Sequence, residues 1–264
     1  MAKPFRGGFR ITVESPEELD SMRFRILGPV QVRVGRDWRS IQAGQPRLVL
    51  AVLLAQPGRM VTTERLVDAV WGERPPRTAV NTVHAYVLRL RRLFGDGPLV
   101  TQDHGYRLAV GRDDVDAAVF ERLVALGCRE LRAGHSESAA RRLYDALALW
   151  RGPVFADVVD RPVLGARAAE LDRRRAAASE DWIRARLDLG GHADVVDELY
   201  RLVDDQPLRE QRWALLMEAL ALCGRRTESL YAYHQARRVL LDEFGLEPGP
   251  ELRELQRRIL AESA

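Results

Sequence analysis

TAVNTVHAYVLRLRRLF, residues 78–94, has two opposite faces when it is wound as a helix. At about 100° per residue one face is a stripe of large apolar side chains, which we expect to pack on other helices: Val80, Val83, Val87, Leu90 and Phe94. The other face is polar at its N-terminal end and basic at its C-terminal end: Thr78, Asn81, Thr82, Ala85, Arg89 and Arg92, with His84 and Tyr86 on its flanks. Short polar groups and guanidiniums of this kind suit base edges and phosphates in the major groove of DNA, and the N-terminus of the helix can attract a phosphate.

The segments around this helix predict a winged helix-turn-helix. Thr62 or Thr63 is expected to cap a preceding helix that ends at Gly72, and a turn with two prolines leads to Thr78, which caps the helix quoted above. Gly95 to Pro98 end that helix, and residues 99–110 are typical of a β-hairpin. Upstream, residues 22–34 predict a hairpin, residues 38–41 a further strand and residues 47–55 a helix.

Charge is distributed unevenly between the two parts of the chain. Residues 22–112 contain 15 arginines and 6 acidic residues, a net charge of +9, whereas residues 113–264 contain 23 arginines and 28 acidic residues, a net charge of −5. The first part therefore favours a polyanionic partner and the second does not. Residues 1–21 are polar and irregular, and we expect a flexible N-terminal arm to which no function is assigned.

Composition is typical of a two-domain soluble protein, with 264 residues, 46% of them hydrophobic and 30% charged. No apolar run approaches the length of a membrane span and the N-terminus lacks a secretory signal, so we expect a cytoplasmic, nucleoid-associated protein without a membrane partner. Cys128 and Cys223 lie far apart in apolar helical patterns, which favours buried free thiols and argues against a structural metal.

The second part is helical throughout. Helices are expected at residues 116–132, 137–150, 164–189, 193–204, 208–223, 226–244 and 250–260. From His192 to Gly245 the helix–turn–helix units have a period near the roughly 34 residues of tetratricopeptide repeats, which predicts an irregular tetratricopeptide-like array. Its tryptophans are expected in the core: Trp150, Trp182 and Trp213. The basic run at residues 173–175 is expected on a solvated helix face or against acidic side chains, and residues 245–250 to set the angle of the last helix.

Catalytic motifs are missing from the sequence. It contains no GxSxG, no GxxxxGK[ST], no HExxH and no GxGxxG, and its five histidines show no metal-ligand spacing. We therefore expect no catalytic residues, no cofactor and no metal site, and a protein that is not an enzyme.

Several motifs together resemble a known family. WGERPP, NTVHAYVLRLRRLFG and GYRL, which begin at Trp71, Asn81 and Gly105, are similar to the OmpR/PhoB-type DNA-binding domain. ALALWRGPVFADV and LLDEFGLEPGPELRELQRRIL, which begin at Ala146 and Leu240, resemble the bacterial transcriptional activation domain. The two in this order resemble the small Streptomyces antibiotic regulatory protein (SARP) family over residues 22–262.

The resemblance implies a fold and a set of partners. The fold is α+β, an N-terminal winged helix-turn-helix at residues 22–112, followed by an all-α, tetratricopeptide-like activation domain at residues 113–264. Such activators bind direct repeats in promoter DNA as a head-to-tail pair, so we expect a homodimer at least on DNA. They recruit RNA polymerase, including sigma region 4, and switch on clusters for secondary metabolites such as antibiotics.

The same resemblance assigns residues to the DNA. The base-contacting positions are Asn81, Thr82, His84, Ala85, Tyr86, Arg89 and Arg92. The phosphate-contacting positions are Arg47, Trp71, Arg74, Arg77 and Thr78. In the hairpin, or wing, His104 and Arg107 either contact DNA or are merely solvated, and Tyr106 is expected to anchor the wing in the core. OmpR-type wings often carry arginine where this chain has Gln102, Asp103 and His104.

Two other functions remain open. A tetratricopeptide-like scaffold would use the winged helix to contact protein, and a repressor would occlude a promoter. The basic outward face at residues 78–94 argues against the scaffold. The resemblance to an activation domain argues against the repressor.

Overall fold

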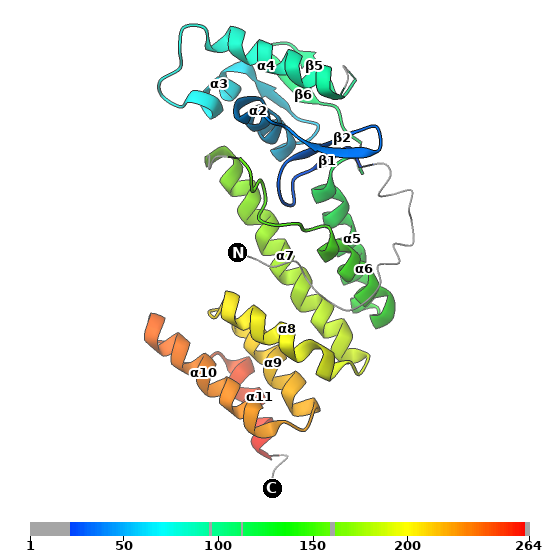
Figure 1. The fold of residues 1–264 in the computed structure, drawn as a ribbon. Coiled ribbons are helices and arrows are strands. Elements are labelled where there is room, and N and C mark those ends of the chain that lie inside the picture. The colour runs from blue at the N-terminus through cyan, green and yellow to red at the C-terminus, as the bar shows by residue number, and fades with distance from the viewer. Residues whose placement is uncertain (1–21, 95–96, 112, 159–161, 262–264) are drawn as a thin grey trace. The chain divides into compact units, whose positions relative to one another are not determined.

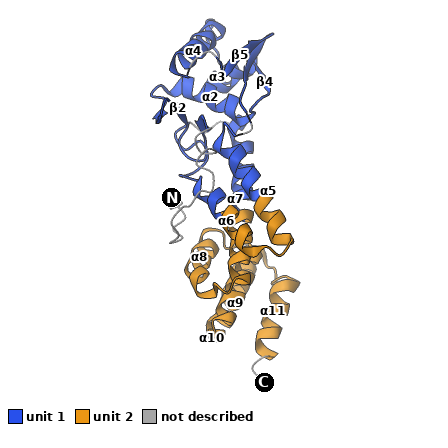
Figure 2. Cartoon of the chain, turned by 90° about the vertical axis from the view of Figure 1, so that its right-hand side faces the viewer, with its two compact units in different colours: residues 1–125, 144–176 blue, residues 126–143, 177–264 orange. Residues whose placement is uncertain are grey.

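A computed structural model describes residues 22–94, 97–111, 113–158 and 162–261 (Figure 1). The expected arm at residues 1–21 lies outside the described residues. The chain forms two compact units (Figure 2): the first extends to Ala125 and includes Tyr144–Ala176, and the second comprises Leu126–Leu143 and Ala177–Ala264. The fold class predicted from the sequence, a winged helix-turn-helix followed by a helical domain, is confirmed.

The first unit begins with a three-stranded antiparallel sheet. Strands β1 (Phe24–Arg25), β2 (Gln31–Val34) and β3 (Asp37–Ser40) are hydrogen-bonded in that order, so both the hairpin and the further strand expected here are confirmed. Val32 faces Phe24 on one side and Arg39 on the other. Phe24 and Val32 are buried, whereas every side chain of β3 is exposed or half-buried.

Three helices form the helix-turn-helix core: α2 (Gly44–Ala55), α3 (Thr63–Trp71) and α4 (Ala79–Phe94). Helix α2 is buried from Leu48 to Ala55 and contacts both α3 and α4. Thr62 caps α3, since its hydroxyl oxygen accepts a hydrogen bond from the Arg65 N–H at 3.2 Å. Gly72 ends the helix with a positive φ of 63°, a conformation that suits glycine.

The wing is part of a second sheet that was only half predicted. Strands β5 (Leu99–Gln102) and β6 (Gly105–Leu108) form the expected hairpin, and β4 (Met60–Thr62) pairs with β6 as a third antiparallel strand. A Cβ on Gly105 would lie 2.2 Å from the carbonyl oxygen of Val61, so only glycine allows this close approach of β4 to β6. The three residues of β4 carry too little pattern to be predicted from the sequence alone.

The first unit also contains parts of α5 (Asp116–Arg132), α6 (Ser136–Ala148) and α7 (Pro162–Asp188). Trp150 is buried as expected and meets the edge of Phe120 with 5.4 Å between the ring centroids. The guanidinium of Arg175 lies 4.7 Å over the Trp150 ring, and Arg174 pairs with Glu170 at 2.8 Å. The basic run therefore makes contacts within the chain, as the sequence suggested.

The second unit contains α8 (His192–Asp205), α9 (Glu210–Leu222), α10 (Arg226–Phe244) and α11 (Pro250–Ala261). Helix α9 packs against the other three helices, and Trp182 and Trp213 are buried as expected. Gly245 ends α10 in the left-handed conformation. The Gly249 N–H then donates to a carboxylate oxygen of Glu210 at 2.6 Å, so the segment before α11 is held against α9.

The cysteines are more accessible than the sequence indicated. Cys128 and Cys223 are both free, but each is half-buried rather than buried. The Cys128 thiol donates to a carboxylate oxygen of Asp181 at 3.1 Å. Burial, this hydrogen bond and the negative charge of Asp181 raise the pKa of the Cys128 thiol to about 12.

Among the described residues, no helix is both long enough and apolar enough to cross a membrane.

Candidate nucleic-acid interface

Helix α4 buries one face in the winged helix-turn-helix core. Its buried residues are Ala79, Val83, Val87 and Leu90. Val80, which the sequence placed in this stripe, is 47% exposed, so that prediction was wrong. Ala79 takes the buried place in the first turn instead. Phe94 is half-buried and meets the edge of Phe24 with 5.5 Å between the ring centroids.

The opposite face of α4 is open to solvent. Thr78 and the following predicted contact residues are exposed: Asn81, His84, Ala85, Arg89 and Arg92. Thr82 is half-buried, and its hydroxyl donates to the Thr78 carbonyl at 2.9 Å, which leaves its oxygen as an acceptor. The face therefore presents hydrogen-bonding groups along the helix, as base-edge recognition requires.

Tyr86 lies against Trp71 rather than on the outward face. The two rings are stacked with 6.3 Å between centroids and 17° between planes, and both side chains are half-buried. Trp71 is the last residue of α3 and Tyr86 lies in the middle of α4. The stack therefore connects the two helices of the motif at the rim of the outward face.

Leu88 is a part of this face that sequence reasoning missed. Its side chain is 53% exposed, and at about 100° per residue it lies between Asn81 and His84 around the helix. An exposed leucine beside polar groups can contact the methyl group of thymine, which is an apolar feature of the major groove. Its position in the helical pattern, between two polar residues and away from the apolar stripe, is the signal that could have identified it.

Four arginines surround the outward face, and none of them has a counter-ion among the described residues. Arg74 and Arg77 lie in the turn between α3 and α4, and Arg89 and Arg92 lie in the last turns of α4. All four are exposed, and in the described part of the chain none forms an ion pair or a hydrogen bond. This concentration of unpaired positive charge suits a polyanion.

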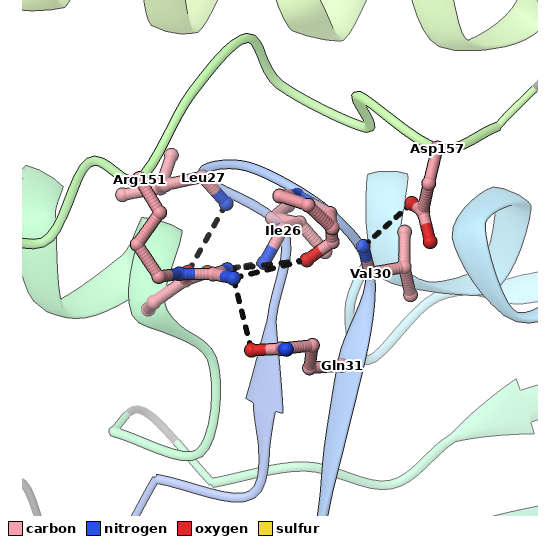
Figure 3. A network of polar contacts seen from close by, with 8 residues as sticks. Ile26, Leu27, Val30, Gln31, Arg151 and Asp157 are labelled. Carbon is pink, nitrogen blue, oxygen red and sulfur yellow. Dashed lines mark hydrogen bonds and ion pairs between the residues drawn. The ribbon is translucent and has the colours of Figure 1, made fainter. Parts of the chain in front are cut away.

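Arg47, by contrast, is already paired (Figure 3 shows its partner, Asp157). Its Nη1 atom lies 2.8 Å from Oδ2 of Asp157, and both side chains are 21% exposed. The other oxygen of Asp157 accepts a hydrogen bond from the Val30 N–H at 2.7 Å. The carboxylate of Asp157 therefore holds the turn between β1 and β2 and also holds Arg47 on α2, the residue that was predicted to contact a DNA phosphate.

A second carboxylate, Asp116 at the start of α5, supports the same turn. It is buried and accepts hydrogen bonds from the N–H groups of Ile26 at 2.8 Å and Leu27 at 3.0 Å. Arg151 lies 3.4 Å from Asp116 and donates to the Pro29 carbonyl and to Gln31 (Figure 3). Burial raises the pKa of Asp116, while the N–H donors and Arg151 oppose that rise.

The backbone continues this attachment. The N–H groups of Arg151, Phe155 and Ala156 donate to the carbonyls of Leu27, Ile26 and Gly28 at 2.8 to 3.2 Å. The segment that contains Arg151 and Asp157 is therefore bound to the N-terminal sheet within the first unit. Sequence reasoning missed it, because its partners in the sheet lie 120 or more residues away in the sequence.

The wing is fixed to α4 by an arginine. Arg91 donates to the Leu99 carbonyl at 2.9 and 3.1 Å and to the Thr101 hydroxyl at 2.7 Å. Tyr106 is buried, as expected for a residue that anchors the wing. At the tip, Asp103 has a positive φ of 44° and His104 is exposed, while Arg107 in β6 is half-buried.

Two depressions border α4, and their charges differ. The depression beside the wing has a volume of about 330 Å³. It is lined by two acidic residues and two histidines, Glu64, Asp103, His84 and His104, together with Val80 and Tyr106. The one on the other side, of about 690 Å³, lies between the end of α4 and the β3–α2 segment, and its charged residues are Arg39, Arg89 and Arg92. Positive charge therefore accumulates on the side of α4 away from the wing.

Within the described ranges, no group of three or more His, Cys, Asp or Glu side chains could hold a metal ion.

Comparisons with known proteins match both parts of the chain. Residues 44–108 match the family "Transcriptional regulatory protein, C terminal", and residues 115–260 match the "Bacterial transcriptional activator domain". The regulatory protein DnrI of Streptomyces peucetius is 34% identical over 90% of this chain and 92% of its own length. The regulatory protein AfsR of Streptomyces griseus is 37% identical over 94% of this chain, which spans only 26% of AfsR.

A solved structure has the same fold. Mycobacterium tuberculosis EmbR in complex with a low-affinity phosphopeptide matches with a TM-score of 0.87 and 33% sequence identity. The match covers 92% of this chain and 65% of the EmbR chain.

Proposed function

The chain belongs to the SARP family of transcriptional activators, and on that premise we propose that it binds promoter DNA through the outward face of α4 and recruits RNA polymerase. The observation that carries the proposal is the exposed face of α4, which presents Asn81, His84 and Ala85 beside exposed arginines. A carboxamide such as that of Asn81 can bind adenine through two hydrogen bonds.

The N-terminal half of α4 supplies the base contacts in this proposal. Recognition helices place their N-terminal residues on base edges, and here those residues are Asn81, Thr82, His84 and Ala85. Tyr86, stacked on Trp71, supports the rim of this surface. Arg74, Arg77 and Thr78, which are exposed, would contact phosphates beside the N-terminus of the helix.

In this proposal two copies of the chain bind one promoter site, which consists of two half-sites. One winged helix contacts a single half-site, so we propose a head-to-tail homodimer on direct repeats, formed at least on DNA. The helical activation domain then contacts RNA polymerase, including sigma region 4. We propose that the regulated genes are those of a secondary-metabolite cluster, because the chain belongs to the SARP family.

Selection from a random DNA library with the full chain tests the proposal. We expect an enriched site that contains two copies of one short motif in the same orientation. Asn81→Ala should then lower affinity for this site about 5- to 150-fold, which corresponds to roughly 1–3 kcal/mol, and relax the preference at one base pair. His84→Ala should weaken binding too.

His234→Ala is the matched control, because His234 is an exposed histidine on a helix of the second unit, α10. We expect it to bind DNA like the parent chain. Failure of the parent chain to enrich any sequence would overturn the proposal, and so would binding by the Asn81 and His84 variants that equals that of the control.

Transcription in vitro separates an activator from a repressor. On a template that carries the selected site upstream of a promoter, purified protein should increase the transcript yield. A decrease would show that the protein occludes the promoter. An unchanged yield, with site binding intact, would remove polymerase recruitment from the proposal.

A further inference from the structure

Three guanidiniums converge on the groove at the end of α4. Arg89 and Arg92 approach it from the helix, and Arg39 approaches it from β3. Ser40 and Gln42 also line the groove and add a hydroxyl and a carboxamide, and among the described residues no acidic side chain is part of the lining. The floor is apolar, with the buried side chains of Ile41, Pro46 and Leu90.

In the part of the chain that the structure describes, none of these three arginines has a counter-ion. All are exposed, and across the described residues none of them forms an ion pair or a hydrogen bond. Some exposed arginines of the second unit do have a counter-ion: Arg225 pairs with Glu228 at 2.7 Å and Arg237 with Glu247 at 2.6 Å. Three like charges around one groove repel each other, and an anion placed between them relieves that repulsion.

When the first turns of α4 enter the major groove of DNA, the length of the helix brings the arginine-lined groove of the protein to the edge of that major groove. Arg89 lies eight residues after Asn81, which is about 12 Å along the axis, and Arg92 lies about 16 Å along it. The major groove is only about 12 Å wide. If the first turns of α4 contact base edges, Arg89 and Arg92 are therefore beside the sugar-phosphate backbone.

We propose that Arg39, Arg89 and Arg92 form a clamp for a backbone phosphate at the edge of the major groove. The inference rests on the proposed function and adds to it a DNA contact from the N-terminal sheet, Arg39. From the sequence we expected Arg89 and Arg92 to contact bases; the groove assigns them to phosphate instead. The wing-side depression, with Glu64 and Asp103, does not suit a phosphate in this way.

The dependence of DNA binding on salt tests the clamp. Each phosphate contact contributes about 0.9 to the slope of log K against log salt concentration. Because the three guanidiniums share one phosphate, Arg39→Ala should reduce the slope by up to that amount, so the affinity loss of the variant relative to the parent chain shrinks by up to about 3.5-fold between 50 and 200 mM salt. Binding should weaken equally on all sequences, and selection should return the same motif as for the parent chain.

Arg36→Ala is the control for Arg39→Ala. Arg36 is an exposed arginine in the turn between β2 and β3, it lies outside the groove, and its loss changes the net charge equally. Arg89→Ala and Arg92→Ala should behave like Arg39→Ala. Equal salt slopes for the Arg39 and Arg36 variants would overturn the clamp, as would a changed base preference in the Arg89 or Arg92 variant.

Other results remain distinguishable. A parent chain that enriches no sequence contradicts the proposed function itself, whereas a parent chain that enriches a motif while Arg39→Ala binds it normally contradicts only the clamp. An acidic polypeptide is the alternative occupant of the groove. If Arg39→Ala binds DNA normally but fails to activate transcription, the groove takes such a partner and the phosphate assignment is wrong.

Discussion

Arg47 and Asp157 are 110 residues apart in the sequence and form an ion pair with 2.8 Å between Nη1 and Oδ2. Arg47 lies on α2 of the winged helix-turn-helix, and Asp157 lies in the segment between α6 and α7. The residue that the family resemblance assigns to a DNA phosphate is thus neutralised by an acidic residue of the activation domain match, residues 115–260. DNA and Asp157 would compete for the same guanidinium.

Asp157→Asn should strengthen DNA binding. Its amide oxygen can still accept the Val30 N–H bond, but the negative charge that holds Arg47 is gone. We expect the salt slope to increase by up to about 0.9, as for one additional phosphate contact. The double variant Arg47→Ala/Asp157→Asn should lose that gain. A slope that does not change in Asp157→Asn would show that Arg47 contacts no phosphate.

Asp116→Ala should destabilise the first unit strongly. It leaves the N–H groups of Ile26 and Leu27 without an acceptor and Arg151 without its ion pair, and breaking a buried pair of this kind costs about 3–5 kcal/mol. Asp116→Asn retains an acceptor and should cost less. Urea denaturation at pH 7 measures both, and a loss below about 1 kcal/mol for the alanine variant would contradict this role.

The same carboxyl should make stability depend on pH. Burial raises the pKa of Asp116 in the folded state above its value in the unfolded chain. The stabilisation that this raised pKa adds to the free energy of unfolding is therefore fully present below the pKa of Asp116 in the unfolded chain, and it is lost as the pH rises through its pKa in the folded state. Asp116→Asn lacks this titration, so its stability relative to the parent chain should improve as the pH rises from about 4. A constant difference between the two across that range would contradict the shift.

Gly105→Ala should disrupt the wing. The added Cβ would lie 2.2 Å from the Val61 carbonyl oxygen and 2.8 Å from the Thr62 Cα, and both are backbone atoms that cannot move aside separately. We expect a loss of about 1–3 kcal/mol or more in the free energy of unfolding. Gly97→Ala is the control, since a Cβ there meets no atom within 4 Å. Equal stabilities of the two variants would contradict the close packing of β4 on β6.

Cys128 should react slowly with alkylating reagents despite being half-buried. With a pKa of about 12, only about one thiol in ten thousand is ionised at pH 8, and the thiolate is the reactive form. In a Cys223→Ser background, iodoacetamide should modify Cys128 about a thousandfold more slowly than a model thiol. Asp181→Asn removes the negative charge but keeps an oxygen that can accept the thiol hydrogen bond, and it leaves the burial unchanged, so it should accelerate the reaction only in part. Rapid alkylation before that substitution would contradict the raised pKa.

Local patterns were sufficient to predict most elements and one face of the interface. The period of the apolar residues placed α4 within a residue of its observed start, and the cap at Thr62 follows from the chemistry of its hydroxyl. Asn81, His84 and Ala85 lie on the exposed side because three of their neighbours, Val83, Val87 and Leu90, must be buried. Val80 shows the limit of this reasoning, because the period alone does not give the width of the covered arc.

The sequence by itself determined the winged helix-turn-helix, the helical domain and the basic character of α4, since periodicity, caps and charge act between residues close in the chain. Only the tertiary structure decided that Asp157 holds Arg47, that β4 joins the wing, and that Arg39 reaches the groove beside Arg89 and Arg92. Each of these depends on residues far apart in sequence, whose proximity is set by how the elements pack and has no local signal.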